Sequence, residues 1–438
     1  MNRADKINQV INDLEKKGST FENRDELVNR SLELTKKDIS LEEVIDSIRE
    51  NMEICTKEFL IKKSKYDINY ISGISSCIYI PSFDNSGEIK LKFIGGNSSR
   101  NNDLRINENT LFDVASITKL YTLILAFEFE RIGLINLNER ISDVDKDFKG
   151  LEDFTFNDLI RLCGEIETKG NITSAKSIEE AYTILKTASL KSNDRTINKY
   201  TDFGAIIIGE ALCKRVKETY NIDLKFEDLI DMFILTPLNL KNTLFNPKTT
   251  NTSGNNNYNY VHDPKARILG GAVGSAGIFT TSDDLAKLAK AIYSVNYINK
   301  KFLSSDYVRR MGEIPFPESP SSNKGNLGLY VKHPRGLDKT YTPNESAKFS
   351  FSMQGWTGSI AIFDPYNLIH QNILVNSILE SNDKDIVLND KPRGFGGAMD
   401  EYLKQITFNT MLTYIAKKYY NTYCNSKESI DKTSKVVR

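Results

Sequence analysis

The first part of the chain places hydrophobic residues every three to four positions, which is the period of an amphipathic helix. The pattern predicts a helix over residues 40–63, inside an otherwise polar and charged segment that extends from residue 1 to 66. The apolar positions of this helix are Leu41, Val44, Ile45, Ile48 and Met52. We interpret residues 1–66 as an N-terminal helical extension whose apolar face packs against a neighbouring part of the protein.

Two short β-type runs follow, over residues 74–81 and 88–94, and the polar segment between them contains Ser, Asn and Gly. Such a pattern is typical of a β-hairpin. From residue 110 to 295 the helical period dominates instead. It predicts helices over residues 116–132, 156–162, 177–190, 202–216, 226–235 and 282–293. Gly133 stands directly after the first of them, where a left-handed helix cap belongs.

Near the C-terminal end the β-type runs return. They predict strands over residues 327–332, 348–353, 359–364 and 371–378, followed by a last helix over 399–420. The Asn-rich stretch 249–260 contains Gly254 and predicts an exposed loop. Strands near both ends with helices between them indicate an α+β fold. Both ends of the chain would complete one antiparallel sheet, flanked by helices, and an all-helical domain would be inserted in the middle.

Composition and charge exclude several classes of protein. The 438 residues include 58 Lys and Arg and 58 Asp and Glu, so the net charge is zero, and no dense basic block indicates a nucleic-acid partner. No apolar run reaches the roughly 18–20 residues that span a bilayer, and the N-terminus has no apolar signal core. We therefore expect a cytoplasmic protein without a membrane span. The five scattered cysteines predict neither a zinc site nor a disulfide framework.

Histidine is scarce as well, since His262, His333 and His370 are the only three in the chain. We therefore predict no metal site and no cofactor. A Ser-His-Asp triad would have few candidates for its base.

The strongest local signal is the sequence FDVASITK at residues 112–119, in which Ser116 and Lys119 form an S-x-x-K motif. If a helix begins at Ser116, both side chains lie on one face, and the hydroxyl is at the positive end of the helix dipole. A lysine activates a serine only when burial or nearby positive charge lowers the lysine pKa. Four-residue matches are common by chance, so the motif alone also fits a helix-capping serine followed by a lysine in solvent.

Four further landmarks follow the motif in order along the chain. They are Y-T-D at residues 200–202, P-L-N-L-K-N-T-L-F at 237–245, V-H-D-P at 261–264 with a glycine-rich stretch at 270–279, and G-W-T-G-S at 355–359. Together with the S-x-x-K motif they resemble the serine β-lactamase and penicillin-binding-protein superfamily, in its branch of class C β-lactamases, DD-peptidases and related esterases. The resemblance covers roughly residues 74–415.

The resemblance implies a β-lactamase/transpeptidase-like hydrolase domain over residues 67–425. Its α/β part would comprise residues 67–125 and 270–425, and its helical part residues 126–269. A polar tail would occupy residues 426–438.

The resemblance also implies a role for each motif residue. Ser116 would attack an ester or amide carbonyl and form an acyl-enzyme, with Lys119 and Tyr200 as the proton relay. The backbone N–H groups of Ser116 and Ser359 would hold the oxyanion. The substrate would lie beside Asp202, Trp356, Thr357 and Gly358. The last two of these would shape a strand along which the substrate backbone runs.

Two positions depart from the family pattern. Trp356 stands where penicillin-recognising members carry Lys or His, so an aromatic wall replaces a positive group that would bind a substrate carboxylate. Asp202 stands in place of Asn and leaves two interpretations open. Its carboxylate either pairs with Lys119 and raises the lysine pKa, or it caps the following helix. We expect His262 to be structural rather than the base of a triad.

The resemblance therefore predicts a serine hydrolase that acts on a small-molecule ester or amide. A related alternative is DD-carboxypeptidase or β-lactamase activity, which the absence of a leader and the two departures oppose. Another alternative is a catalytically silent binding or scaffold protein that retains the fold, which the presence of Ser116, Lys119 and Tyr200 opposes. The sequence predicts no particular oligomeric state.

Overall fold

The computed structural model places most of the central part of the chain. It describes residues 46, 49–50, 72–81, 88–98, 104–162, 164–192, 199–249, 251–253, 261–295, 302–312, 330–331, 342, 346–347 and 349–376. Residues 46, 49 and 50 are helical, as predicted. The rest of the predicted extension, the last helix over 399–420 and the tail over 426–438 lie outside the described residues. Within the described part, no helix has the length and apolar character needed to cross a membrane.

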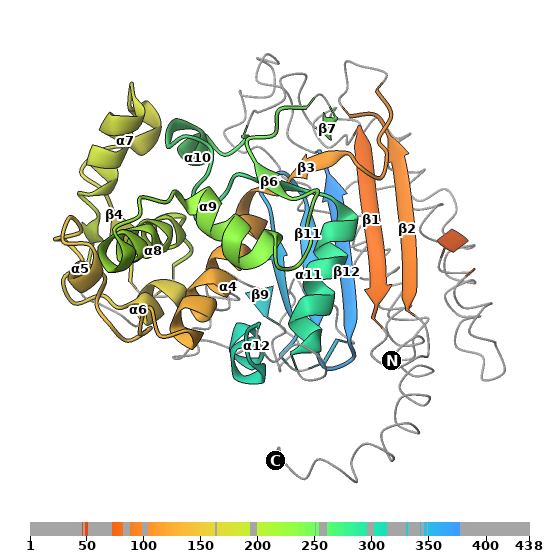
Figure 1. Ribbon diagram of the computed structural model, residues 1–438. Helices are drawn as coiled ribbons and strands as arrows, with labels where there is room; N and C mark the ends of the chain where they lie inside the picture. The colour runs from red at the N-terminus through yellow and green to blue at the C-terminus, as the bar shows by residue number, and fades with distance from the viewer. Residues whose placement is uncertain are drawn as a thin grey trace, which may run out of the picture.

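A six-stranded antiparallel sheet forms the centre of the fold (Figure 1). Its strands lie in the order β2-β1-β12-β11-β10-β9. Their bounds are β1 Gly73–Ile80, β2 Ile89–Gly96, β9 Tyr330–Val331, β10 Phe351–Gln354, β11 Ile360–Asp364 and β12 Ile369–Val375. The predicted hairpin is β1 and β2, and β1 also pairs with β12. Strands from both ends of the described chain therefore complete one sheet, which confirms the predicted fold class.

Helix α11 (Ser282–Ser294) covers one face of this sheet. It packs against β1 and β12, and Figure 1 shows it lying across the strands. Its apolar side buries residues such as Leu285 against the sheet. At its C-terminal end, the Tyr293 hydroxyl donates to the carbonyl of Ile369 at 2.8 Å and accepts the N–H of Asp364 at 3.1 Å. These bonds fix the end of the helix on β11 and β12.

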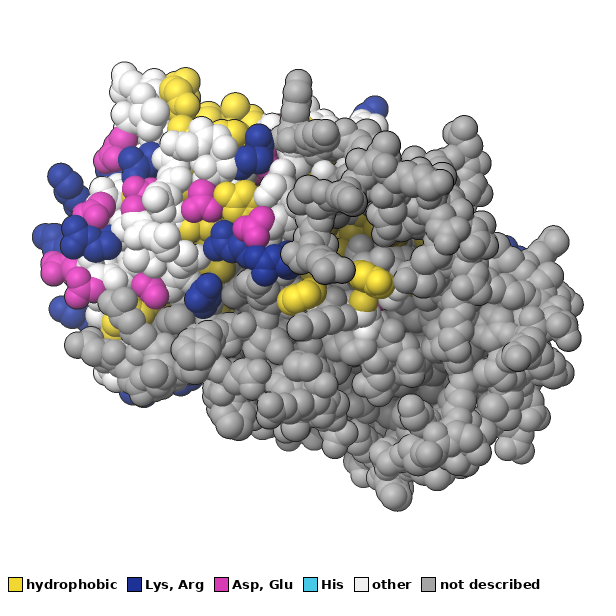
Figure 2. Space-filling model, turned by 90° about the horizontal axis from the view of Figure 1, so that it is seen from below, with side chains coloured by type: hydrophobic (Ala, Val, Ile, Leu, Met, Phe, Trp, Pro, Cys, Tyr) yellow, Lys and Arg dark blue, Asp and Glu magenta, His cyan; other side chains and the backbone are white. Residues whose placement is uncertain are grey.

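A helical part lies beside the sheet, between β3 and β8 in the sequence (Figure 1). Its helices are α4 Thr118–Arg131, α5 Ile141–Val144, α6 Phe156–Ile160, α7 Ile178–Leu185, α8 Phe203–Tyr220, α9 Phe226–Ile230 with a π-helical turn Asp231–Leu235, and α10 Pro264–Ile268. Helix α12 (Ser305–Met311) follows α11. Figure 2 shows acidic and basic side chains interspersed over the helical part. The boundaries predicted for the two parts stay predictions.

Helix α4 is the central helix of this part. It packs against α8 and α9, and its residues from Thr118 to Phe129 are all buried. A helix that is buried on every side does not show a one-sided apolar pattern. Its buried lysine and glutamate therefore need polar partners inside the protein.

A four-stranded sheet joins the helical part to the main sheet. Its order is β6-β8-β3-β7. The strands are β3 Leu111–Asp113, β6 Leu244–Phe245, β7 Thr252–Ser253 and β8 Ile278–Thr280. A further pair, β4 (Ile166–Glu167) and β5 (Ser189–Leu190), lies in the helical part. Because β3 leads directly into the S-x-x-K motif, the four-stranded sheet sets the position of that motif.

The helix predicted over residues 116–132 begins later than expected. Residues Ala115–Ile117 form a 3₁₀ turn, η1, and α4 starts only at Thr118. The reason is the backbone of Ala115, whose φ of 43° is left-handed and cannot belong to a regular helix. At the other end Gly133 has a φ of 77°, which confirms the predicted left-handed cap.

Two other predictions also need correction. The Asn-rich stretch 249–260 was expected to be exposed, but its residues Thr252 and Ser253 are buried in β7. Burial is tolerated because the strand is hydrogen-bonded, for example between the Ser253 hydroxyl and the Ser98 carbonyl at 3.3 Å. The helix predicted over 177–190 ends at Leu185, and its last two residues belong to β5.

Gly274 is a position where the fold requires glycine, and we predict a large loss of stability from Gly274→Ala. A Cβ atom there would lie 2.0 Å from the carbonyl oxygen of Ala205 on α8, so the backbone would have to move. The free energy of unfolding should fall by about 3 kcal/mol, as for severe overpacking, when measured by urea denaturation. Gly170→Ala is the matched control, because its nearest atoms would be 3.7 Å away. Equal urea midpoints for the two variants would contradict the prediction.

Candidate active site

Ser116 lies in the tight turn η1 between β3 and α4. The preceding residue, Ala115, has the left-handed conformation described above. The carboxylate of Asp113 holds this turn, because its Oδ1 accepts the N–H of Ala115 at 2.8 Å. Ser116 itself is 9% exposed. The strained backbone is at Ala115, directly before the buried serine. Such strain recurs at functional sites, where the surrounding structure maintains it.

Two polar side chains converge on the Ser116 hydroxyl. Its oxygen accepts hydrogen bonds from Lys119 Nζ at 2.8 Å and from the Tyr200 hydroxyl at 2.7 Å. Lys119 Nζ also donates to Asp202 Oδ1 at 2.8 Å and to the Ser275 carbonyl at 3.2 Å. An ammonium has three N–H donors, so these contacts use all of them. The structure thus brings the predicted serine, lysine, tyrosine and aspartate into one cluster.

Asp202 follows the first of its two predicted alternatives. It directly precedes α8, but its side chain makes no capping hydrogen bond there. Its Oδ1 pairs with Lys119, and its Oδ2 pairs with Nζ of Lys265, each at 2.8 Å. A carboxylate removed from water needs such partners to remain charged. The aspartate therefore belongs to the ion-pair cluster and not to the cap of the helix.

These ion pairs determine which groups carry a charge. Burial favours the neutral form of Lys119, but the contacts with Asp202 and Tyr200 outweigh burial and raise the lysine pKa above its usual value. Burial also disfavours the charged form of Asp202, yet Lys119 and Lys265 together lower the pKa of this carboxyl. Lys119 is therefore an ammonium at neutral pH. A lysine that acts as a base needs a lowered pKa, so the pairing opposes that role.

The sequence motifs did not point to Lys265. This residue lies on α10, directly after the V-H-D-P motif, and its side chain is 32% exposed. Its Nζ also lies 6.0 Å from the ring centroid of Phe203. No other sequence signal marks this residue, because Lys119 and Asp202 alone already form a neutral pair.

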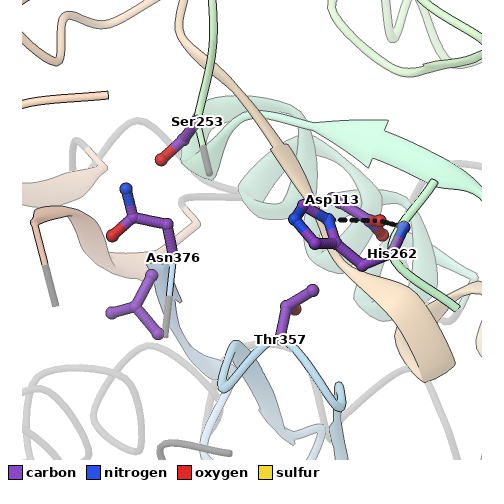
Figure 3. Close-up of a pocket in the computed structure, with 6 residues that line it drawn as sticks. Asp113, Ser253, His262, Thr357 and Asn376 are labelled. Carbon is purple, nitrogen blue, oxygen red and sulfur yellow. Dashed lines mark hydrogen bonds and ion pairs between the residues drawn. The ribbon is translucent and has the colours of Figure 1, made fainter. Parts of the chain in front are cut away.

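His262 belongs to a second polar cluster, centred on Asp113 (Figure 3). Asp113 Oδ2 accepts the backbone N–H of His262 at 2.8 Å and lies 3.1 Å from its Nδ1. The other oxygen of Asp113 holds the turn that carries Ser116, so His262 acts on that turn through the carboxylate. This geometry agrees with a structural role for His262. Among the described residues, no group of three or more His, Cys, Asp or Glu side chains is arranged to hold a metal ion.

The third motif lies between β10 and β11, which correspond to the strands predicted over residues 348–353 and 359–364. Residues Trp356, Thr357 and Gly358 lie in a turn between β10 and β11. The Gly358 N–H donates to the Gly355 carbonyl at 2.9 Å, and the φ of 93° at Gly358 reverses the chain. Thr357 is buried beside the Asp113–His262 pair (Figure 3). Contact of these residues with substrate, and their part in shaping the strand along which it would run, stay predictions.

Gly355 is the point where β10 meets the turn of the nucleophile. A Cβ atom at Gly355 would lie 2.3 Å from the carbonyl oxygen of Val114, so the two backbones are in direct contact. Ser359 lies at the start of β11, where its hydroxyl donates to the Val375 carbonyl at 3.3 Å and accepts the N–H of that residue at 3.2 Å. Gly355 of the third motif therefore lies directly against the nucleophile turn.

The antiparallel sheet, the adjoining helical part and the contacts of Ser116 define a serine hydrolase of the β-lactamase type. The family model for β-lactamase matches residues 84–385, and the chain belongs to this family. Among curated proteins, it is similar to one from Salmonella gallinarum named "Putative D-alanyl-D-alanine carboxypeptidase". The two are 23% identical over 320 residues, which are 62% of this chain and 70% of the relative. The protein of the same name from Salmonella typhi is 22% identical over 320 residues, with the same coverage.

Solved structures show the same fold. A class C β-lactamase superimposes with a TM-score of 0.58 at 17% identity and covers 82% of this chain and 97% of its own. D-alanine carboxypeptidase AmpC from Burkholderia cenocepacia gives a TM-score of 0.57 at 14% identity, with 82% and 99% covered. FmtA from Staphylococcus aureus gives 0.55 at 15% identity, with 89% and 97% covered. These similarities establish the architecture, whereas the chemistry depends on the residues of the site.

Proposed function

We propose that this protein hydrolyses a small ester or amide through an acyl-enzyme on Ser116, with Lys119 and Tyr200 as the proton relay. The observation that supports this function most directly is the contact of Ser116 Oγ with both groups, at 2.8 and 2.7 Å. A serine hydroxyl is a weak nucleophile until a positioned partner takes its proton. The cluster is buried, and each electrostatic interaction in it is stronger than it would be in water.

In the first step, Ser116 Oγ attacks the carbonyl carbon while the Tyr200 oxygen receives the serine proton. Before this transfer the phenol gives its own proton to a water molecule, which leaves Tyr200 as the phenolate that accepts the serine proton. The Lys119 ammonium, 4.9 Å from the ring centroid of Tyr200, stabilises the negative charge that results. The proton then passes to the leaving alcohol or amine, which departs and leaves the acyl group on Ser116. A water molecule attacks the acyl-enzyme in the same way and releases the acid.

The oxyanion of the tetrahedral intermediate needs two N–H donors in fixed positions. The first is the N–H of Ser116. The second, as the resemblance to the family implies, is the N–H of Ser359. The N–H of Gly355 itself is used by the Ser359 carbonyl at 2.7 Å.

A second candidate function is DD-carboxypeptidase or β-lactamase activity, and the names of the Salmonella relatives favour it. The same acyl-transfer steps would apply to those amides. Two features of the site oppose it. Trp356 carries no positive charge for a substrate carboxylate, and Asp202 only accepts hydrogen bonds. A silent scaffold is less well supported, since the contacts between the serine, the lysine and the tyrosine are all present.

The proposed function is tested by labelling the purified full-length protein with a fluorophosphonate probe and mapping the adduct by mass spectrometry. We expect one adduct, on Ser116. A folded sample that is not labelled, or that is labelled on another residue, would exclude the proposed nucleophile. A parallel sample with fluorescent penicillin separates the two candidates, because acylation of Ser116 by penicillin would favour the second.

A further inference from the structure

One short segment, residues 261–265, contacts both halves of the proposed catalytic machinery. Near its start, His262 binds Asp113, the carboxylate that holds the turn of the nucleophile. At its end, Lys265 binds Asp202, the carboxylate that holds the lysine of the motif. Asp113 ends β3, and Asp202 directly precedes α8. The segment therefore connects the small sheet to the helical part at the site.

We propose that His262 and Lys265 are positioning residues, which fix the nucleophile and the relay through Asp113 and Asp202 without touching the reacting atoms. This inference rests on the proposed function above. We call the contact of His262 with Asp113 the His262 arm and the contact of Lys265 with Asp202 the Lys265 arm. In each arm, the carboxylate gives one oxygen to the segment and the other oxygen to the catalytic machinery. Because one rigid segment anchors both carboxylates, the distance between the nucleophile turn and the relay is fixed.

The Lys265 arm determines the orientation of Asp202. Each oxygen of this carboxylate binds one lysine at 2.8 Å. Asp202 is the only hydrogen-bond acceptor that Lys265 meets among the described residues. The other charged group close to this pair is Asp263, whose Oδ1 accepts the N–H of Ala266 at 2.8 Å and so faces α10. Without Lys265, Oδ2 of Asp202 loses its partner, and the carboxylate can rotate relative to Lys119.

The His262 arm determines the position of Asp113. Asp113 Oδ2 accepts the backbone N–H of His262 and also contacts its ring Nδ1. Asp113 Oδ1 therefore remains to accept the N–H of Ala115. The segment is itself held by Arg267, which donates to the carbonyls of Val261 and His262 at 3.0 and 2.8 Å. Movement of the segment would therefore be transmitted to the turn that carries the serine.

The first test replaces Lys265 and measures hydrolysis of the ester on which the wild-type protein is most active. Lys265→Met should lower kcat by about 10- to 100-fold, the usual cost of lost orientation, with KM changed by less than about threefold. Lys265→Arg should restore most of kcat, because it again places a cation on Asp202. The matched control is Lys287→Met, which removes a lysine of similar exposure from buried Asp284, at 2.7 Å on α11. The control should keep the wild-type kcat.

The second test asks whether Lys265 acts through Asp202. In an Asp202→Asn background the carboxylate is absent, so adding Lys265→Met should change kcat by less than about twofold. The same fold-loss in both backgrounds would overturn the inference, and so would an unchanged kcat in the single variant. Failure of the proposed function is a different result, because the wild-type protein would then hydrolyse no ester and take up no fluorophosphonate. For the other arm, His262→Asn, which keeps a side-chain donor for Asp113, should retain more activity than His262→Leu at equal helical content by circular dichroism.

Discussion

Ser116→Ala should abolish hydrolysis, with kcat/KM lowered by about 10⁴-fold or more for any ester that the wild-type protein accepts. The expected loss is large because the alanine removes the atom that forms the acyl-enzyme, and no second nucleophile replaces it. Lys119 keeps its contacts with Asp202 and with the Ser275 carbonyl, so the cluster should stay in place. Steady-state kinetics with a chromogenic ester, together with fluorophosphonate labelling, measure the effect.

A matched control for this substitution is Ser294→Ala. Ser294 is 7% exposed, close to the 9% of Ser116, and its hydroxyl donates to the Ala291 carbonyl at 2.8 Å on α11. The control should keep full activity, and both variants should unfold at similar urea concentrations. Residual hydrolysis of Ser116→Ala within tenfold of the wild type would show that another residue is the nucleophile.

The fold could be predicted from the sequence because its strongest signals are local. Short β-type runs around a polar turn segment predicted the hairpin of β1 and β2, and similar runs predicted the later strands. The pairing of β1 with β12 required only that strands from both ends of the chain each have one edge left unpaired by their sequence neighbour. Polarity misled the prediction for β7, because a buried strand of Thr252 and Ser253 is stabilised by hydrogen bonds that link it to distant segments.

The site was predictable in its members but not in its electrostatics. The motif order identified Ser116, Lys119 and Tyr200, and the structure places them in contact. Which interpretation of Asp202 holds depends on Lys265, which is 63 residues away in sequence and carries no motif of its own. The contact of the third motif with the nucleophile turn could not be predicted either. Sequence spacing cannot show which glycine contacts Val114, since that contact depends on how β10 meets η1.

Lys119→Met should lower kcat/KM by about 10²- to 10³-fold, the range lost when a group that stabilises developing charge is removed from an active site. The methionine fills the buried space but removes the positive charge beside Ser116 and Tyr200. If the lysine only stabilised the fold, activity would fall in proportion to the unfolded fraction. Single-turnover acylation by a chromogenic ester, compared with the folded fraction from circular dichroism, separates the two explanations. Wild-type acylation by the folded variant would contradict the relay.

The same substitution should make the protein unfold at a higher pH on acidification. Lys119 and Lys265 lower the pKa of Asp202 in the folded state, so the ionised carboxylate stabilises the protein above its usual pKa of 3.8. That stabilisation is lost as pH falls through the lowered pKa. In Lys119→Met one of the two cations is gone and the folded-state pKa of Asp202 rises toward 3.8, so the carboxylate contributes less stability at every pH above 3.8 and acid unfolds the variant at a higher pH. An acid titration followed by circular dichroism measures the shift against Lys287→Met as the control, and equal acid midpoints would show that the Lys119–Asp202 pair does not stabilise the fold.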